Sequence, residues 1–129
     1  TTKTPYYFRM QDDDLFAVAG LYEYRPGDAA APAMTTFTVL TTAANALMAP
    51  IHDRMPVIVA ESAYDQWLDP RNTGARGLEA LLQPYDPVAM QMHRVSPRVN
   101  SVRNDDAALM EEVAASAILV PMPLQGQLL

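Results

Sequence analysis

The sequence predicts an α+β fold with an antiparallel or mixed sheet and short helices at its edges. Segments rich in β-branched and aromatic residues come first along the chain, and mixed segments follow them. Eleven prolines interrupt the sequence and keep each element short. Strands and helices do not alternate regularly, and this argues against a doubly wound parallel sheet.

The first part of the chain is predicted to be extended. Residues 6–10 and 15–24 are apolar or aromatic, and the stretch 11–14 between them is typical of a turn because Asp side chains support turns. These two segments therefore predict a β-hairpin. A turn at 25–28 and a loop of small residues lead to 34–42, where β-branched residues predict a third strand.

The middle of the chain is predicted to hold a short helix and a buried strand. Thr41 or Thr42 is expected to cap a helix over 43–48, because a hydroxyl can accept from the first free backbone N–H groups. Pro50 ends that helix. The apolar segment 57–60 predicts a strand that is buried on both faces.

The later elements are predicted to be mixed. Ser62 is expected to cap a helix that ends at Leu68, and leucines at helical spacing over 78–82 predict a second helical stripe. Residues 88–95 alternate loosely and predict a strand, and 107–113 predict a last short helix.

Composition excludes several classes of protein. The length is that of one ordinary domain. The net charge of −6 and the pI near 4.6 argue against a general nucleic-acid binder. The chain has no cysteine, which excludes disulfides, Cys-ligated zinc and a thiol nucleophile of its own and suits a reducing cytoplasm, where we expect the protein. No apolar run approaches the ~18 residues of a membrane span, so no membrane partner is expected.

The segment around His52 is the most informative for chemistry. His52, Asp53 and Arg54 follow one another between Pro50 and Pro56, and the prolines restrict the backbone that holds these polar groups. Histidine is well suited to proton transfer near neutral pH, and an arginine can bind a carboxylate or phosphate through two hydrogen bonds. The alternative is that both side chains satisfy backbone carbonyls in a tight loop.

A second candidate region is basic. It carries Arg94, Arg98 and Arg103 without a carboxylate between residues 93 and 103, and such a patch could meet phosphates. The alternative is that these arginines pair with the acidic residues just downstream. Three aromatic residues are candidates for base stacking or, alternatively, for the core: Tyr6, Tyr7 and Trp67.

Other chemistry is weakly supported. His52 and His93 lie far apart and outside any metal-binding spacing, so no metal is expected. Glu23 alternates with two tyrosines on a strand, so it is predicted to point to solvent or to an arginine. A hydrolase that pairs His52 with Ser62 or Ser96 lacks any supporting motif.

Several segments in order resemble the SRAP family, the SOS-response-associated peptidase domain. The resemblance runs to about Val113, and its most specific part is the sequence Ile-His-Asp-Arg-Met-Pro at 51–56. The other segments that carry it are 3–8 (KTPYYF), 16–23 (FAVAGLYE), 37–45 (FTVLTTAAN), 67–69 (WLD), 95–96 and 99–100 (VS and VN), and 103–106 (RNDD).

The resemblance implies a curved, barrel-like sheet, no cofactor and an enzyme that senses abasic sites in single-stranded DNA. In the family, self-cleavage exposes an N-terminal cysteine that forms a thiazolidine with the ring-opened abasic sugar, assisted by a glutamate, an asparagine and a histidine. The histidine carries over onto His52. The phosphate-contacting arginine carries over onto Arg54, and a DNA-contacting threonine falls at or next to Thr41.

The chain departs from the family at its beginning. The family's cysteine, asparagine-arginine motif and catalytic glutamate all precede the segment that matches residues 3–8, and the motif-like stretch 20–24 follows it, so Glu23 receives no catalytic role. We therefore expect residues 1–129 to be the C-terminal portion of one SRAP-like domain, with a variable tail at 114–129. The expected partners are single-stranded DNA and the missing N-terminal half of the domain, or self-association. The alternative is a non-catalytic module that binds single-stranded DNA or protein.

Overall fold

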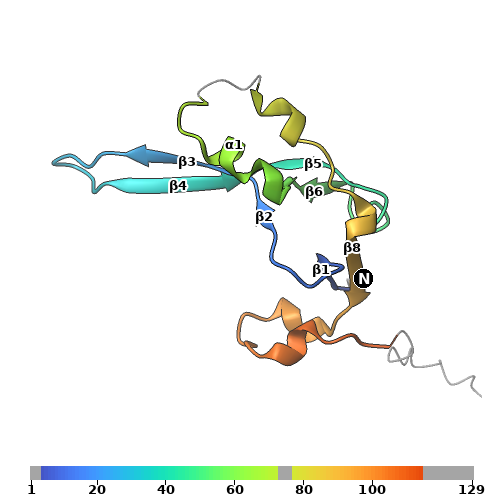
Figure 1. The fold of residues 1–129 in the computed structure, drawn as a ribbon. Coiled ribbons are helices and arrows are strands. Elements are labelled where there is room, and N and C mark those ends of the chain that lie inside the picture. The colour runs from blue at the N-terminus through green and yellow to red at the C-terminus, as the bar shows by residue number, and fades with distance from the viewer. Residues whose placement is uncertain (1–3, 73–76, 115–129) are drawn as a thin grey trace, which may run out of the picture. The chain divides into compact units, whose positions relative to one another are not determined.

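The computed structural model describes residues 4–72 and 77–114, and it divides the chain into two compact units (Figure 1). Arg9–Gln91 forms one unit, and the described residues of Thr1–Phe8 and Met92–Leu129 form the other. The structure is mixed, mostly sheet with one short α-helix among the described residues, so the predicted combination of strands and short helices is confirmed.

The elements are short and pair two by two. The strand pairs are β1–β8, β2–β7, β3–β4 and β5–β6. The strands are β1 (Tyr6–Met10), β2 (Ala17–Val18), β3 (Gly20–Arg25), β4 (Met34–Val39), β5 (Thr41–Ala43), β6 (Arg54–Pro56), β7 (Ile58–Val59) and β8 (Met90–Arg94). The helices are α1 (Tyr64–Leu68) and the 3-10 helices η1 (Glu61–Ala63), η3 (Glu79–Leu81), η4 (Pro87–Ala89), η5 (Pro97–Asn100) and η6 (Ala107–Met110).

The predicted hairpin between residues 6–10 and 15–24 is wrong, although both segments are extended. β1 pairs with β8, and the backbone N–H of Gln11 continues toward that strand by donating to the Ala89 carbonyl at 2.9 Å. Asp13 then adopts a left-handed backbone conformation with φ of 64°. The acidic stretch is thus a turn that leads the chain away from β1, not a hairpin loop that returns along it.

A ring of three backbone hydrogen bonds organises the Arg9–Gln91 unit. Ala19 donates to Val57 at 2.8 Å, Val57 donates to Leu40 at 2.9 Å, and Leu40 donates to Ala19 at 2.9 Å. Each of these residues is the break between two short strands, where the chain leaves one partner strand and joins another. The ring pairs one backbone N–H and one C=O at each break. This pairing is needed because Ala19 and Val57 are buried, where water cannot reach their backbone groups.

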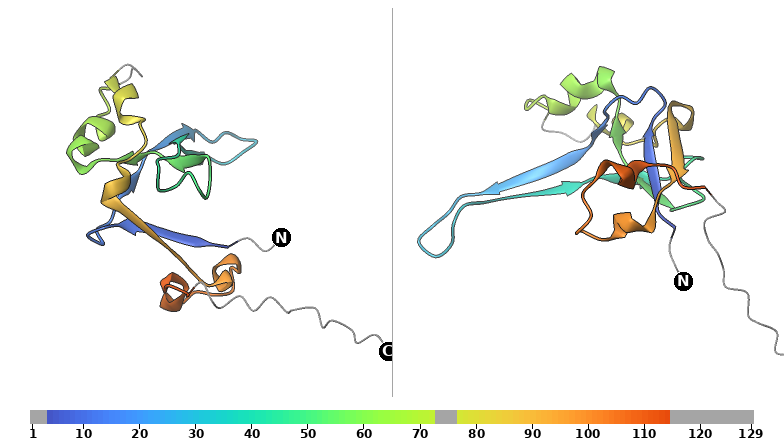
Figure 2. Two further views of the ribbon diagram at one scale, coloured as in Figure 1. Left: turned by 90° about the vertical axis from the view of Figure 1, so that its right-hand side faces the viewer. Right: turned by 90° about the horizontal axis from the view of Figure 1, so that it is seen from below.

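The segment 34–42 is extended as predicted, but it is divided at Leu40 into β4 and β5. β4 and β3 form an antiparallel hairpin that runs out from the rest of its unit (Figure 2). Its connecting loop is tightened by the Asp28 carboxylate, which accepts from the backbone N–H groups of Ala30 and Ala31 at 2.8 and 2.9 Å. A side chain at Gly27 would clash with the backbone of Ala33, so the loop requires glycine there.

The helix predicted over 43–48 is replaced by a turn that begins after β5. Thr41 and Thr42 do not cap a helix, because both pair with β6, opposite Pro56 and Met55. The cap is Asn45, whose Oδ1 accepts from the Met48 backbone N–H at 2.9 Å. β6 was not predicted from the sequence, and it forms because three residues of β5 supply an antiparallel partner for it.

The helical segment after β7 differs in its cap from the prediction. η1 and α1 are contiguous and end at Leu68 as predicted, but the residue before η1 is Ala60 and Ser62 lies inside it. The chain then turns at Asp69, which accepts from Arg71 through both carboxylate oxygens. This contact lowers the pKa of the Asp69 carboxyl below its ordinary value.

The remaining elements are shorter than predicted. The helical stripe over 78–82 forms only η3, the strand over 88–95 forms η4 followed by β8, and the helix over 107–113 forms η6. Within the described residues no helix is long and apolar enough to cross a membrane. Of the expected tail at 114–129, residues 115–129 lie outside the described residues.

Two apolar clusters form the core of the Arg9–Gln91 unit. Methionines dominate the first, as expected for residues that fill irregular gaps: Met10, Met55, Ile58 and Met90, with Leu47, Met48 and Tyr85 packed against them. The second contains Ala19, Val57, Val59 and Ala63, with Leu40, Tyr64, Trp67, Leu81 and Leu82 around it. The described residues contain no closed barrel, so the barrel-like curvature stays an expectation.

We predict that Met55→Ala lowers the free energy of unfolding by about 2–4 kcal/mol, because it leaves a cavity in the first cluster. Met55 is only 1% exposed, whereas Leu15 is 98% exposed, so Leu15→Ala serves as the matched control and should change stability by less than about 0.5 kcal/mol. Urea unfolding followed by circular dichroism checks both values, and equal stability of the two variants would contradict this account of the core.

Candidate active site and nucleic-acid interface

The β5–β6 hairpin positions two of the predicted site residues. Ala43 pairs with Arg54 and Thr41 pairs with Pro56, so these residues share one face of the two-stranded ladder. Met55 points to the opposite face and is buried in the core. Burial of Met55 therefore fixes Arg54 on the solvent side of the hairpin.

Arg54 and Thr41 contact each other directly. Nη2 of Arg54 donates to the Thr41 carbonyl oxygen at 2.6 Å and lies 2.8 Å from its hydroxyl Oγ1. Both residues are exposed. The two contacts orient the guanidinium along the hairpin while, among the described residues, no hydrogen bond uses its other two nitrogens. The group is thus oriented and still able to donate to an anion.

His52 is positioned by a buried side chain that sequence reasoning did not single out. Asn45 is buried, and its Nδ2 donates to the Tyr85 carbonyl at 2.8 Å while its Oδ1 caps the turn at Met48. The Met48 carbonyl in turn accepts from the backbone N–H groups of Ile51 and His52 at 2.8 and 3.0 Å. Asn45 therefore anchors the turn that delivers His52 to the start of β6.

The His52 ring has two partners for the same nitrogen. Its Nδ1 accepts from the Arg54 backbone N–H at 3.0 Å, and the Asp53 carboxylate lies 3.1 Å from Nδ1. With the Arg54 amide as donor, the neutral ring carries its proton on Nε2. When the ring is protonated, Nδ1–H can donate to Asp53 and Nε2 keeps its proton. In both forms Nε2 presents a proton to a bound molecule.

The predicted basic patch lies in the other unit, and two of its arginines already have partners. Arg94 lies over the Tyr6 ring at 5.9 Å and donates from Nε to the Tyr6 hydroxyl at 3.2 Å. Arg98 forms an ion pair with Asp106 at 2.6 Å, as the alternative interpretation expected. Arg103 is exposed. The patch is therefore partly neutralised within its own unit.

The aromatic and serine candidates are mostly structural. Trp67 packs against the second core cluster, so the core interpretation is confirmed for it. Tyr7 lies against His93, with ring centroids 5.5 Å apart, and both tyrosines at 6 and 7 are half-buried. Ser96 caps η5 by accepting from the Arg98 backbone N–H, and Ser62 lies within η1. Neither serine thus shows the arrangement of a nucleophile beside a base.

No metal site is formed by the part of the chain that the structure describes, since no three His, Asp or Glu side chains cluster in a way that could hold an ion. Glu23 lies on the exposed strand β3 opposite Thr36, consistent with the solvent-facing position predicted for it.

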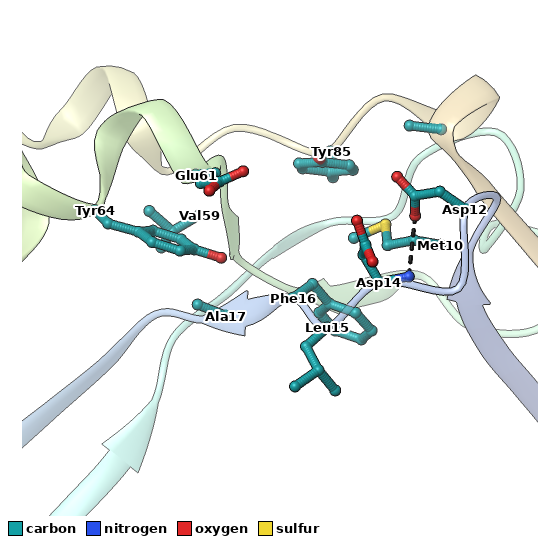
Figure 3. Close-up of a pocket in the computed structure, with 11 residues that line it drawn as sticks. Met10, Asp12, Asp14, Leu15, Phe16, Ala17, Val59, Glu61, Tyr64 and Tyr85 are labelled. Atoms are coloured by element: carbon teal, nitrogen blue, oxygen red, sulfur yellow. Dashed lines mark hydrogen bonds between the residues drawn. The ribbon is translucent and has the colours of Figure 1, made fainter.

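A hollow of about 610 Å³ in the Arg9–Gln91 unit was not predicted from the sequence (Figure 3). Aromatic rings from Phe16, Tyr64 and Tyr85 line it together with three carboxylates, those of Asp12, Asp14 and Glu61. Its acidic lining disfavours a phosphate, so we do not assign it to DNA. These residues come from three separate stretches, at 12–16, at 61–64 and at Tyr85, and no spacing could have indicated that the three stretches meet.

The fold and this geometry define a small mixed α/β protein that presents an oriented arginine beside a proton-carrying histidine on an exposed hairpin. The chain belongs to the SRAP family, since residues 1–102 match the family described as SOS response associated peptidase (SRAP). The predicted family is therefore confirmed.

Similar proteins support this membership. The Abasic site processing protein YoqW of Bacillus subtilis is 44% identical over 110 residues, which cover 85% of this chain and 49% of that protein. The Abasic site processing protein HMCES of Gallus gallus is 36% identical over 93 residues, which cover 70% of this chain and 27% of that protein. The chain spans about half the length of the bacterial relatives it matches.

Solved structures show the same fold. A crystal structure of a protein from Bacteroides thetaiotaomicron is 25% identical, with a TM-score of 0.76 over 88% of this chain and 50% of that one. A crystal structure of a protein from Bordetella bronchiseptica is 27% identical, with a TM-score of 0.63 over 72% of this chain and 46% of that one.

We predict that the neutral form of His52 carries its proton on Nε2, because the Arg54 amide occupies Nδ1. Imidazole ¹⁵N chemical shifts of the labelled chain, recorded across the titration of the ring, check this assignment. Asp53→Asn is the matched control and should leave the neutral tautomer unchanged. Asp53 lies near Nδ1, but the Arg54 amide is the group that donates to Nδ1 in the neutral ring. A neutral ring protonated mainly on Nδ1 would contradict the assigned hydrogen bond.

Proposed function

We propose that this chain is the DNA-contacting portion of an SRAP protein that recognises abasic sites in single-stranded DNA. The observation that carries the proposal is the grouping of His52, Arg54 and Thr41 around one exposed hairpin in a chain of this family. The names of the relatives, which are abasic site processing proteins from bacteria and vertebrates, support the same substrate.

The proposed reaction is covalent capture of the ring-opened sugar. Ring opening of the abasic hemiacetal gives an aldehyde. The amine of an N-terminal cysteine condenses with that aldehyde and releases water, and the cysteine thiol then adds to the resulting imine carbon to close a thiazolidine ring. Self-cleavage, in which a peptide bond is hydrolysed, exposes that cysteine. This chain contains no cysteine, so the nucleophile must come from the segment that the longer relatives possess.

His52 is proposed to act on ring opening and on self-cleavage as the acid-base catalyst. The protonated ring can donate its Nε2 proton to the sugar ring oxygen as the bond from that oxygen to the anomeric carbon breaks. The Asp53 carboxylate lies 3.1 Å from Nδ1 of the same ring. Exposure of the ring fits this role, because a bulky nucleic-acid substrate must reach it.

Arg54 is proposed to bind the phosphate next to the abasic site. Its contacts with Thr41 hold the guanidinium in place before DNA arrives, which reduces the entropy lost on binding. Thr41 is proposed to contact the same backbone. Arg94, Arg98 and Arg103 are proposed as further phosphate contacts, with Arg98 exchanging Asp106 for phosphate.

The chain itself is proposed to be the C-terminal portion of a single SRAP domain over 1–129, with a variable tail at 114–129. A local basic surface can bind DNA although the net charge is −6, because screening limits the reach of distant charges to about 10 Å.

A second candidate function follows from the missing cysteine: the chain alone could serve as a non-catalytic module that binds single-stranded DNA.

For an intact protein that joins this chain to the N-terminal portion, we predict a covalent adduct with abasic single-stranded DNA that survives denaturing electrophoresis. His52→Ala should slow both adduct formation and self-cleavage by about 10²-fold or more, because it removes the proton donor. Asp53→Ala is a milder variant and should retain the adduct. Unchanged rates for His52→Ala would refute the role given to His52.

For the 129-residue chain alone, we predict reversible binding to single-stranded DNA without any adduct. Arg54→Ala should weaken binding about two- to fivefold, the effect of one exposed ion pair, and should reduce the slope of log K against log salt by about 0.7. Fluorescence anisotropy at several salt concentrations measures both. Arg71→Ala, which removes an exposed arginine elsewhere, is the control and should leave the slope unchanged. A stable adduct would show that the nucleophile is not missing.

A further inference from the structure

The β3–β4 hairpin leaves the side chains of both its strands uncovered. Every residue of both strands is exposed, although the two strands are among the longest in the chain. Six large apolar side chains of the hairpin are accessible to solvent: Leu21, Tyr22, Tyr24, Met34, Phe37 and Val39. A patch of this kind on a two-stranded ribbon marks an interaction surface, because such ribbons are rarely stable alone.

The register gathers most of the aromatic surface on one face. Tyr22 lies opposite Phe37 and Tyr24 lies opposite Thr35, and residues two apart on a strand share a face. Tyr22 is 79% exposed and Phe37 is 81% exposed, so this central pair is covered by nothing in its own unit. We call this surface the Tyr22–Phe37 face.

The edges of the hairpin are also open. Within the described residues β3 pairs only with β4, and β4 pairs only with β3. The outer edge of each strand therefore presents backbone N–H and C=O groups that another strand could pair with. Lysine and proline, which proteins use to block such edges, are absent from both strands.

The comparisons indicate how much protein is available to cover this surface. The chain spans 49% of the length of YoqW and 50% of the solved Bacteroides protein, while the same solved structure superposes with a TM-score of 0.76. The fold of the matched half is thus present, and about half of the length of each of these relatives lies outside the match.

We propose that the β3–β4 hairpin is the docking surface for the other half of an SRAP domain, which adds a strand to its open edge and covers the Tyr22–Phe37 face. The inference rests on family membership and on burial, and it does not depend on the catalytic roles proposed above. The two strands carry one glutamate and one arginine and the loop between them carries one aspartate, so the hairpin has no excess of positive charge, which favours an apolar protein partner over DNA.

The test uses this chain and, as the partner, the segment of YoqW that lies outside the matched 110 residues, produced together in one cell. We expect the two polypeptides to co-purify and the amides of β3 and β4 to become protected from hydrogen exchange. The double variant Tyr22→Ser and Phe37→Ser should weaken the association about tenfold or more, because it removes the central aromatic pair. Val88→Ser is the matched control, since Val88 is also 79% exposed, and it should leave the association unchanged.

Several outcomes would overturn the proposal. The partner segment could fail to co-purify, or the double variant could bind it as tightly as the Val88→Ser control does. The chain alone could form a dimer by light scattering that the double variant abolishes, in which case a second copy occupies the surface. The double variant could also lose DNA binding while keeping the partner segment, which would assign the face to nucleic acid. Circular dichroism of each variant shows that a loss of binding is not a loss of fold.

Discussion

The closed ring of hydrogen bonds among Ala19, Leu40 and Val57 is the constraint on which the larger unit depends. Three stretches of chain meet there, and each pairs with one neighbour before the ring and with the other neighbour after it. A short chain thereby makes three two-stranded ladders from three strand segments. Because each ladder shares its strands with the other two, none can shift its register without disturbing the ring.

The ring separates the polar candidate site on β5 and β6 from the apolar hairpin formed by β3 and β4. Beyond the ring in one direction, β5 and β6 turn Met55 into the core and Arg54 toward solvent. The buried amide of Asn45 then holds the turn that carries His52. Beyond the ring in another direction, β3 and β4 leave the core altogether. The polar site and the apolar hairpin are therefore built from the same strands, continued past one junction.

Local chemistry in the sequence was sufficient to predict many elements but not their partners. The aromatic run 6–10 and the β-branched run 34–42 are strands, because side-chain shape favours extended backbone without reference to the rest of the chain. Pairing depends on contacts between distant residues, so the acidic turn at 11–14 suggested a hairpin that does not form. His52 and Arg54 were candidate site residues because they lie in a polar run between Pro50 and Pro56, and the family resemblance then implied a role for each. Asn45 lies in the separate segment 37–45, and its role depends on a partner forty residues later, the Tyr85 carbonyl.

The ring also limits which changes of length the chain can accept. A residue inserted into a strand with a single partner can be absorbed as a bulge at its end. A residue inserted between Pro56 and Val57 would reverse the side-chain alternation of β6 relative to the ring, placing Arg54 toward the methionine cluster and Met55 toward water. Evolution can therefore vary the loops at 26–33 and after Leu68 in length, while the spacing between the three junction residues and the site must stay constant.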